Sequence, residues 1–229
     1  MWVQEVKSAK DIRAFLDIPK KIYKNDPHWI QALDKDIEAV FDKDKNRAYQ
    51  NGYSARWILF DKNNKVIGRV ATFVNKKYEP EQAVGGIGFF EIIEDQEAAF
   101  FLLDHCKNWL EKEGMQAMDG PINFGERDRW WGLLTEGYYE PLYCMNYNPP
   151  YYVDFFEAYG FQVYFNQLCY GMDVDINFHP KFFESHAKIS ENKNIRVENV
   201  KKKQLKKYAK DFAHVYNLAW AQHGGGKTM

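Results

Sequence analysis

The stretch "GFFEIIEDQEAAFFLLDHCKNWLEKEGM", from Gly88 to Met115, passes directly from a strand pattern into a helix pattern. Its first residues are apolar and aromatic, which is typical of a buried strand. Asp95 is suited to the N-cap of the helix, and Gly114 fits the position just beyond its end. Between them, apolar side chains recur at helical spacing and predict one buried face, made of Ala99, Leu102, Leu103, Cys106, Trp109 and Leu110. A strand that leads at once into a long helix indicates an α/β unit.

The residues before this stretch predict a short strand, two helical regions and a β-hairpin. Residues 2–6 alternate as a strand, and residues 12–23 have helical spacing that Pro19 should divide into two pieces. Residues 28–41 continue the helical pattern. Two strand-like runs, 54–61 and 65–75, then flank a turn at Lys62, Asn63 and Asn64.

The residues after it predict further strands around a long loop. Residues 115–122 indicate a buried strand, and an aromatic and charged loop follows. A short helix over 153–160 precedes a last strand pair within 161–176. This alternation of elements predicts an α/β (α+β) domain over residues 1–175.

The tail repeats the head of the chain. "VQEVKSAKDIRAFLDIPKKIYKND" aligns with "VENVKKKQLKKYAKDFAHVYNLAW", which begins at Val197. Residues 176–229 are therefore interpreted as a linker helix followed by the opening strand and helix of a second, truncated copy. Chance similarity between two lysine-rich amphipathic helices is the alternative. A homodimer formed through the 176–229 tail is a further expectation.

Composition limits the classes of partner. The 229 residues carry 31 basic and 32 acidic side chains, a formal net charge of -1, so neither nucleic acid nor a membrane surface is expected as a partner. The first residues have no signal-peptide pattern and no apolar run is long enough to cross a bilayer, so a cytoplasmic location is expected. The histidines and the three cysteines have no ligand spacing, which predicts no metal site.

With the hairpin "WILFDKNNKVIGRVATFVN", the Gly88–Met115 stretch and "YYVDFFEAYGFQVYFNQLCYGMDV", the chain resembles the GNAT superfamily of N-acetyltransferases. It looks most like a bacterial group of tandem GNAT-like proteins that share "GFFE", "GPIN" and "YNPPYY". The resemblance implies a mixed central sheet flanked by helices. It also implies acyl transfer from acetyl-CoA or another acyl-CoA to a small-molecule amine, with the thioester between two splayed central strands. Backbone N–H groups opening the next helix would hold the pyrophosphate.

The sequence departs from that family pattern in two regions, the pyrophosphate loop and the position of the proton donor. The positions that correspond to the pyrophosphate loop include Ile92, Ile93 and Gln96, and the turn has no glycine but carries Glu94, Asp95 and Glu97. These carboxylates and side chains oppose the close approach of a phosphate. Phe156 also stands where the family has a tyrosine proton donor.

Candidate catalytic residues follow from these departures. Tyr151 and Tyr152, with Tyr159, are near enough in sequence to replace the missing donor, and aromatic packing is their alternative role. Glu91, on the strand beside the expected cleft, is a candidate general base if burial raises its pKa, and a surface carboxylate otherwise.

The long loop is the expected place for substrate-binding residues. Its candidates are Asn123, Arg127, Arg129, Trp130 and Trp131, with the tryptophans as a stacking floor and an arginine as an anion clamp. A loop anchored by its tryptophans, with its charges in solvent, is the equal alternative.

Three functions remain open from the sequence. The first is an N-acyltransferase that uses coenzyme A or another activated donor. The second is a non-catalytic GNAT-like ligand-binding or structural domain that has lost the pyrophosphate site. The third is an aminoacyl transferase that uses charged transfer RNA, against which the absence of a basic surface argues.

Overall fold

The computed structural model describes residues 1–76, 82–125, 128–174 and 177–220. The chain divides into two compact units, Met1–Phe165 and Asn166–Met229. Among the described residues, all the buried side chains belong to the first unit. That unit ends at Phe165, whereas the sequence places the end of the first domain near Asp175.

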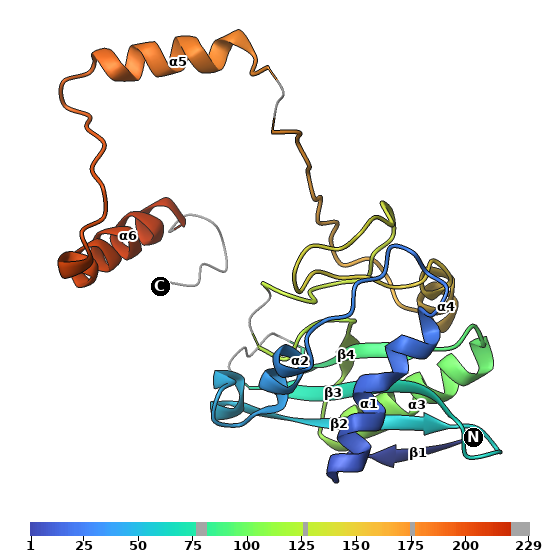
Figure 1. Cartoon of the computed structure of the whole chain (residues 1–229). Coiled ribbons are helices and arrows are strands. Elements are labelled where there is room, and N and C mark those ends of the chain that lie inside the picture. Colours follow the sequence, from blue (N-terminus) through green and yellow to red (C-terminus); the bar gives the residue numbers. More distant parts are fainter. Residues whose placement is uncertain (77–81, 126–127, 175–176, 221–229) are drawn as a thin grey trace. The chain divides into compact units, whose positions relative to one another are not determined.

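The first unit is built on a mixed sheet whose described strands run in the order β1-β2-β3-β4-β5 (Figure 1). The strands are β1 (Trp2–Glu5), β2 (Gly52–Phe60), β3 (Val66–Asn75), β4 (Val84–Ile92) and β5 (Ala117–Asp119). Neighbours from β1 to β4 are antiparallel, and β5 is parallel to β4. The mixed central sheet and the α/β (α+β) class expected from the sequence are confirmed.

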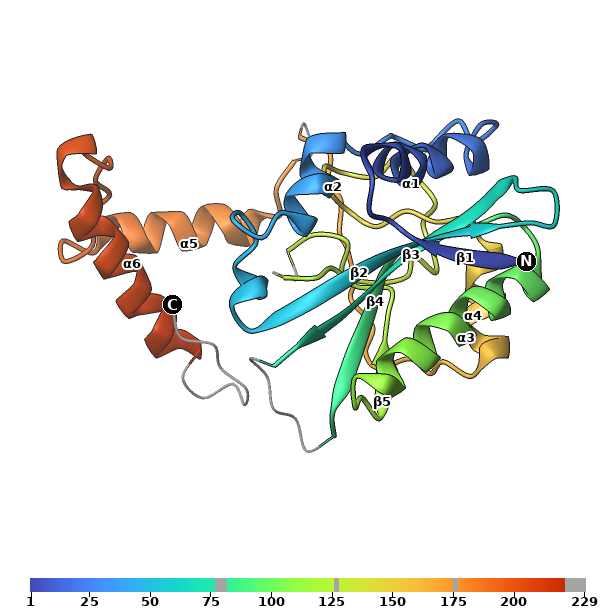
Figure 2. The same ribbon diagram turned by 90° about the horizontal axis from the view of Figure 1, so that it is seen from below.

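Helices cover both faces of this sheet (Figure 2). On one face lie α1 (Ala9–Ile22) and α2 (Asp34–Phe41), and on the other lie α3 (Gln96–Lys112) and α4 (Tyr151–Tyr159). The predicted face of α3 packs on the sheet, and Phe15 of α1 packs on Ile58 from the opposite side. A short 3-10 helix, η1 (Arg47–Gln50), precedes β2.

A β-bulge in β4 determines which side chains reach the α1 face. Arg69 pairs with Glu91 and Ala71 pairs with Gly88, so one residue of β3 lies opposite two residues of β4. Phe89 lies in this bulge and has a left-handed backbone conformation, with φ at 51°. As a result Phe90 packs in the core on the α3 side, while Phe89 packs against α1.

Two helix predictions need correction. Pro19 does not divide the first helix, because it lies in the last turn of a continuous α1 with its ring buried. Residues 28–33 are not helical, and α2 begins at Asp34. No side-chain cap precedes α2, and the Trp29 ring stacks on the Tyr23 ring at 5.0 Å between centroids, so a tertiary contact outweighs the helical pattern.

Several strand predictions after α3 also need correction for the described residues. The buried strand predicted over 115–122 is limited to the three half-buried residues of β5. No strand forms over 161–174, where Tyr164, Leu168 and Tyr170 are largely exposed. No strand forms at the start of the proposed second copy, from Val197 onward. A strand requires a paired neighbour, and alternation alone does not supply one.

The second unit contains α5 (Pro180–Glu191), the 3-10 helix η2 (Lys202–Gln204) and α6 (Leu205–Trp220). The linker helix and the tail helix predicted from the sequence are thus both present. The assignment of the tail as a second copy stays a prediction.

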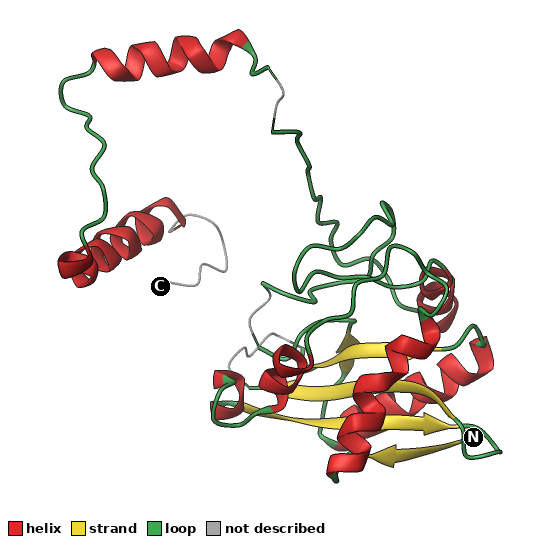
Figure 3. Cartoon of the chain, in the orientation of Figure 1, coloured by secondary structure: helices red, strands yellow, loops and turns green. Residues whose placement is uncertain are grey.

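The described residues between β5 and α4 contain no helix or strand (Figure 3). The start of this loop runs beside the middle of β4, where Ile122 N donates a hydrogen bond to Ile87 O at 2.7 Å. Within the described ranges, no helix is both long enough and apolar enough to cross a membrane. The same ranges contain no cluster of His, Cys, Asp and Glu side chains suited to a metal ion.

Candidate active site

A buried carboxylate lies where three elements meet. Glu91, near the end of β4, is 9% exposed. Its Oε2 accepts hydrogen bonds from the Tyr23 hydroxyl at 2.8 Å and from the Tyr152 hydroxyl at 3.1 Å. Tyr23 follows α1 and Tyr152 opens α4, so the carboxylate joins the helices of both faces at the sheet.

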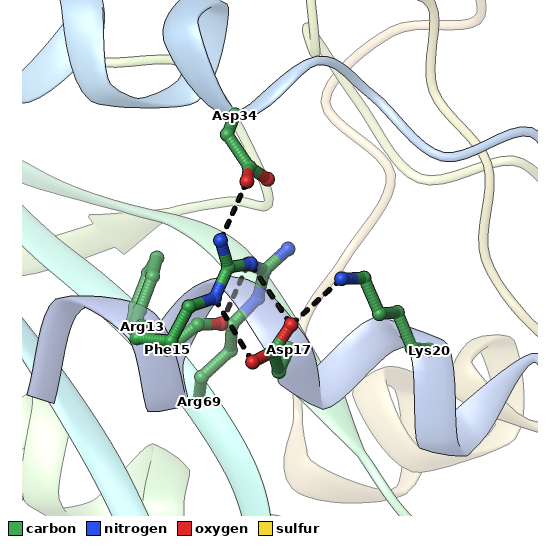
Figure 4. Close-up of polar contacts among 6 residues, drawn as sticks. All are labelled: Arg13, Phe15, Asp17, Lys20, Asp34 and Arg69. Atoms are coloured by element: carbon green, nitrogen blue, oxygen red, sulfur yellow. Dashed lines mark hydrogen bonds and ion pairs between the residues drawn. The ribbon is translucent and has the colours of Figure 1, made fainter. Parts of the chain in front are cut away.

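Arg69 of β3 lies beside this carboxylate, because the strand register pairs it with Glu91. Its Nη2 is 3.5 Å from Glu91 Oε1, and the residue is 3% exposed. Its Nη1 donates to Phe15 O at 2.9 Å (Figure 4). Pro19 explains why that carbonyl is available: in a helix Phe15 O would accept from the N–H of residue 19, and proline has none.

Burial governs the protonation of this cluster. Burial raises the pKa of Glu91, while the Arg69 charge and the two tyrosine hydrogen bonds act in the opposite direction. Burial and the nearby Glu91 charge raise the pKa values of Tyr23 and Tyr152 well above 10.0. The tyrosines therefore remain hydrogen-bond donors, and Glu91 is the group in the cluster that is suited to exchange a proton.

A cavity of about 320 Å³ opens onto Glu91. Arg69 and Tyr152 line the polar end beside the carboxylate. The remaining wall is largely apolar and aromatic, and it includes Trp29, Ile30, Leu33, Ile122, Trp130, Leu142 and Tyr143. Ile30, Leu33, Leu142 and Tyr143 are exposed as well, so they form its rim. The cavity combines a polar end with an apolar mouth.

An ion pair ties the segment 24–33 to α1 through Asp34, the next residue. This segment joins α1 to α2 and carries Trp29, Ile30 and Leu33 of the cavity wall. Arg13 Nη1 is 2.7 Å from Asp34 Oδ2, and Arg13 Nη2 is 2.9 Å from Asp17 Oδ1, which Lys20 also contacts (Figure 4). On the inner side, the Tyr147 hydroxyl donates to Asp26 Oδ2 at 2.7 Å and joins this wall to the long loop. Both edges of the wall are thus tied to structured parts of the unit.

The turn between β4 and α3 has the predicted acidic character. Asp95 is the N-cap, and its Oδ1 accepts from Ala98 N at 3.0 Å. Glu94, Gln96 and Glu97 are all exposed there. A carboxylate about 6 Å from a phosphate charge costs about 0.7 kcal/mol in water and about 3 kcal/mol at an effective dielectric constant of 20. The pyrophosphate of a coenzyme A therefore does not fit the residues of this turn.

The backbone of Ile92 is already engaged. Its N–H donates to the Tyr152 hydroxyl at 2.6 Å, and its carbonyl accepts from the Tyr151 hydroxyl at 2.9 Å. These groups point away from β3, because the next residue, Ile93, supplies the bond to Ile67 O on β3. Of the positions at which the sequence predicted a pyrophosphate loop, Ile92 is thus buried and bonded, while Ile93 and Gln96 are exposed.

The five residues expected to bind substrate are dispersed. Trp130 lines the cavity, and its ring lies 5.1 Å from that of Phe89. Asn123 is buried, and Asn123, Arg129 and Trp131 lie outside the set of cavity-lining residues. Arg129 Nη2 is 3.5 Å from Asp128. Arg127 falls outside the described residues.

The three residues expected to be catalytic are brought together. Glu91 and Tyr152 share a hydrogen bond, and the Tyr151 ring lies 5.1 Å from the Tyr152 ring. Phe156, where the sequence resemblance implied a tyrosine proton donor, is buried and packs against Phe90.

Sequence reasoning missed Tyr23, Arg69 and Trp29. The signal for Arg69 was present: it is a charged residue within the apolar run "VIGRVATFV" of a central strand. Tyr23 belonged to an ordinary amphipathic pattern and gave no comparable signal.

Comparisons with known proteins give distant relatives. No known family profile matches the chain. Protein YghO of Escherichia coli K12 is 22% identical over 223 residues, which are 96% of this chain and 56% of that protein. A bacterial ceramide synthase of Caulobacter vibrioides is 21% identical over 225 residues, which are 96% of this chain and 58% of that protein. The chain thus spans little more than half the length of these curated relatives.

Solved structures of similar fold carry acetyltransferase names. The metagenomic aminoglycoside acetyltransferase meta-AAC0020, in complex with sisomicin, is 10% identical with a TM-score of 0.45 and covers 75% of this chain and 96% of its own. The aminoglycoside 6'-N-acetyltransferase AAC(6')-Ih of Acinetobacter baumannii is 8% identical, also with a TM-score of 0.45, and covers 76% of this chain and 98% of its own. At these identities the likeness concerns the fold alone.

Proposed function

We propose that this chain contains the amine-binding part of an N-acyltransferase, and that Glu91 removes a proton from the amine. The observation that carries the proposal is the buried carboxylate at the polar end of a cavity. A general base must lie within hydrogen-bond reach of its substrate and have a pKa shifted toward the working pH. The position of Glu91 at the cavity and the upward shift of its pKa support this role.

The cavity also suggests the class of amine. Its volume is at the lower end of the range of roughly 300 to 1,000 Å³ that is usual for ligand sites. It can hold an amino head group, while an attached apolar chain lies across Ile30, Leu33 and Leu142 at the rim. The relative named as a ceramide synthase supports this class, because a ceramide is the N-acyl derivative of a long-chain amine. We therefore propose a long-chain primary amine as the acceptor.

The proposed reaction is balanced as follows. The bound ammonium gives one proton to Glu91, and the neutral nitrogen attacks the carbonyl carbon of an activated acyl donor. The C–N bond forms, the bond to the leaving group breaks, and the leaving group takes the second proton from nitrogen. Tyr23 and Tyr152 hold the carboxylate in place through their hydroxyl groups. Glu91 then returns its proton to solvent.

A non-catalytic ligand-binding domain is the second candidate. The acidic turn favours it, because a coenzyme A donor does not fit there. In this case the cavity binds the same amine, and no acyl transfer follows.

An acyl-transfer assay tests the proposal. The chain is mixed with dodecylamine and an acyl N-acetylcysteamine thioester, a simple donor without a nucleotide, and the amide is measured by mass spectrometry. We expect Glu91→Gln to lower the rate by about 100-fold or more. Glu111→Gln, an exposed change on α3 with the same loss of charge, should leave it unchanged.

Two results would contradict the enzyme proposal. One is transfer at the wild-type rate by Glu91→Gln. The other is binding of the amine without any amide above the uncatalysed background, which would favour the non-catalytic domain.

A further inference from the structure

At the end of β4, the backbone N–H and C=O groups that face away from β3 need hydrogen-bond partners. The parallel pairing of β4 with β5 ends at Gly86 and Asp119, so none of the described strands covers the outward-facing backbone groups of Ile92. Buried backbone groups in proteins almost always have partners. Here the two tyrosine hydroxyls of α4 supply them, and the Tyr152 hydroxyl also contacts Glu91. The tyrosines therefore take the place of a neighbouring strand.

Closure of this edge affects any ligand that would lie along it. An extended ligand with amide groups would bind an open strand edge through the N–H and C=O of Ile92. Tyr152 is 1% exposed and packs in the core, where its ring lies 5.4 Å from that of Phe90. A ligand would thus have to break the tyrosine hydrogen bonds and move a buried side chain.

The adjacent turn opposes the phosphate end of such a ligand. The N-cap carboxylate of Asp95 already accepts the N–H of Ala98, one of the free donors at the start of α3. Glu94 and Glu97 add two exposed carboxylates within the same turn. A positive helix end that is complemented internally has little attraction left for a diphosphate.

From these two observations we infer that the Met1–Phe165 unit does not hold a nucleotide-bearing acyl donor at the β4–α3 junction. Tyr151 and Tyr152 close the strand edge, and the acidic turn excludes the diphosphate. The acyl donor of this chain is therefore one without a nucleotide, such as a simple thioester. This inference rests on the proposed function for the existence of an acyl donor, and it assigns the two tyrosines a closing role rather than that of a proton donor.

Calorimetric titration of the full chain with free coenzyme A tests the inference. We expect no measurable binding at about 0.1 mM ligand, a concentration at which a typical cofactor site would fill. A parallel titration with dodecylamine checks that the cavity is intact. Loss of amine binding would count against the proposed function, whereas coenzyme A binding counts against this inference, so the two failures are distinguishable.

Variants that remove charge show which part of the β4–α3 junction prevents coenzyme A from binding. Glu94→Gln/Glu97→Gln is compared with Glu111→Gln/Glu157→Gln, which removes two exposed carboxylates elsewhere on α3 and α4. A gain of coenzyme A affinity in the first variant alone places the exclusion at the turn. No gain in either places it at the tyrosine-closed edge. Wild-type binding with a dissociation constant below about 0.1 mM would overturn the inference.

Discussion

At the scale of single residues, Glu91 and Arg69 form a buried ion pair. Each is almost completely buried, so the loss of hydration is costly for both charges. Their separation of 3.5 Å is long for a strong ion pair, so the tyrosine hydrogen bonds carry much of the carboxylate's stabilisation. Such a cluster weakens folding relative to an apolar core, and a functional use is the simplest reason for its presence.

Removing Arg69 should destabilise the protein in a pH-dependent manner. In Arg69→Met, Glu91 keeps its burial but loses the positive charge that lowers its pKa, so that pKa rises further. A carboxyl group whose pKa is raised on folding stabilises the native state below its unfolded pKa, and this contribution is lost as the pH rises through the folded value. The loss should approach about 3 to 5 kcal/mol at high pH.

Urea unfolding at several pH values measures this effect. The double variant Arg69→Met/Glu91→Gln should recover much of the stability at high pH, because no unpaired charge remains. A destabilisation of the single variant that is independent of pH would contradict a role for the Glu91 charge.

At the scale of elements, the contact between β4 and the start of the long loop shapes the cavity. A Cβ atom at Gly88 would overlap the carbonyl oxygen of Ile122, and Pro121 and Ile122 both line the cavity. Gly88→Ala should therefore destabilise the unit by about 1 to 3 kcal/mol and weaken binding of an amine.

Thermal unfolding with an amine titration checks this expectation. Gly171→Ala, where a Cβ meets nothing within 4 Å, is the matched control and should behave as the wild type. Unchanged stability of Gly88→Ala would mean that the loop moves away from β4 at no cost.

Local patterns predicted the elements that depend on local forces. The helix α3, with its Asp95 cap and its apolar face, and the hairpin of β2 and β3 follow from periodicity and turn residues. The start of α2 and the strands expected after α4 did not follow, because the first depends on the stacking of Trp29 and the second on a partner strand.

The candidate site was also predictable only in part: two of its residues could be identified from the sequence, but not the contacts that join them to the others. Glu91 stood out as a carboxylate on a strand beside the expected cleft, and Tyr152 as a tyrosine near the position of the missing proton donor. Their contact with Tyr23 and Arg69 depends on a bulge and on strand register, which bring together residues 68 positions apart in one hydrogen bond. Composition and spacing contain no information about such register.

At the scale of the whole molecule, the second unit lacks a core in its described residues. Its helix α6 exposes Leu205, Phe212, Val215 and Leu218, although its sequence is amphipathic. An apolar helix face of this kind is usually covered by a partner. We propose that the 176–229 tail joins two copies of the chain in a homodimer.

Sedimentation equilibrium over about 1 to 100 μM protein tests the dimer, because its population depends on concentration. Phe212→Ser should shift the equilibrium toward the monomer, and Lys210→Ser, on an exposed position of the same helix, should not. A wild-type chain that stays monomeric over the whole range would contradict this proposal.

The most direct test of the account is the affinity of the cavity for a long-chain amine, measured with and without the Glu91 charge. Calorimetric titrations with dodecylamine below its micelle concentration are compared for wild type, Glu91→Gln and Glu111→Gln. Above the raised pKa of Glu91, the wild type and Glu111→Gln should bind at least about tenfold more tightly than Glu91→Gln. As the pH falls and Glu91 gains a proton, this difference should disappear. Equal affinity of all three proteins at every pH would contradict the assignment of Glu91 as the residue that receives the amine.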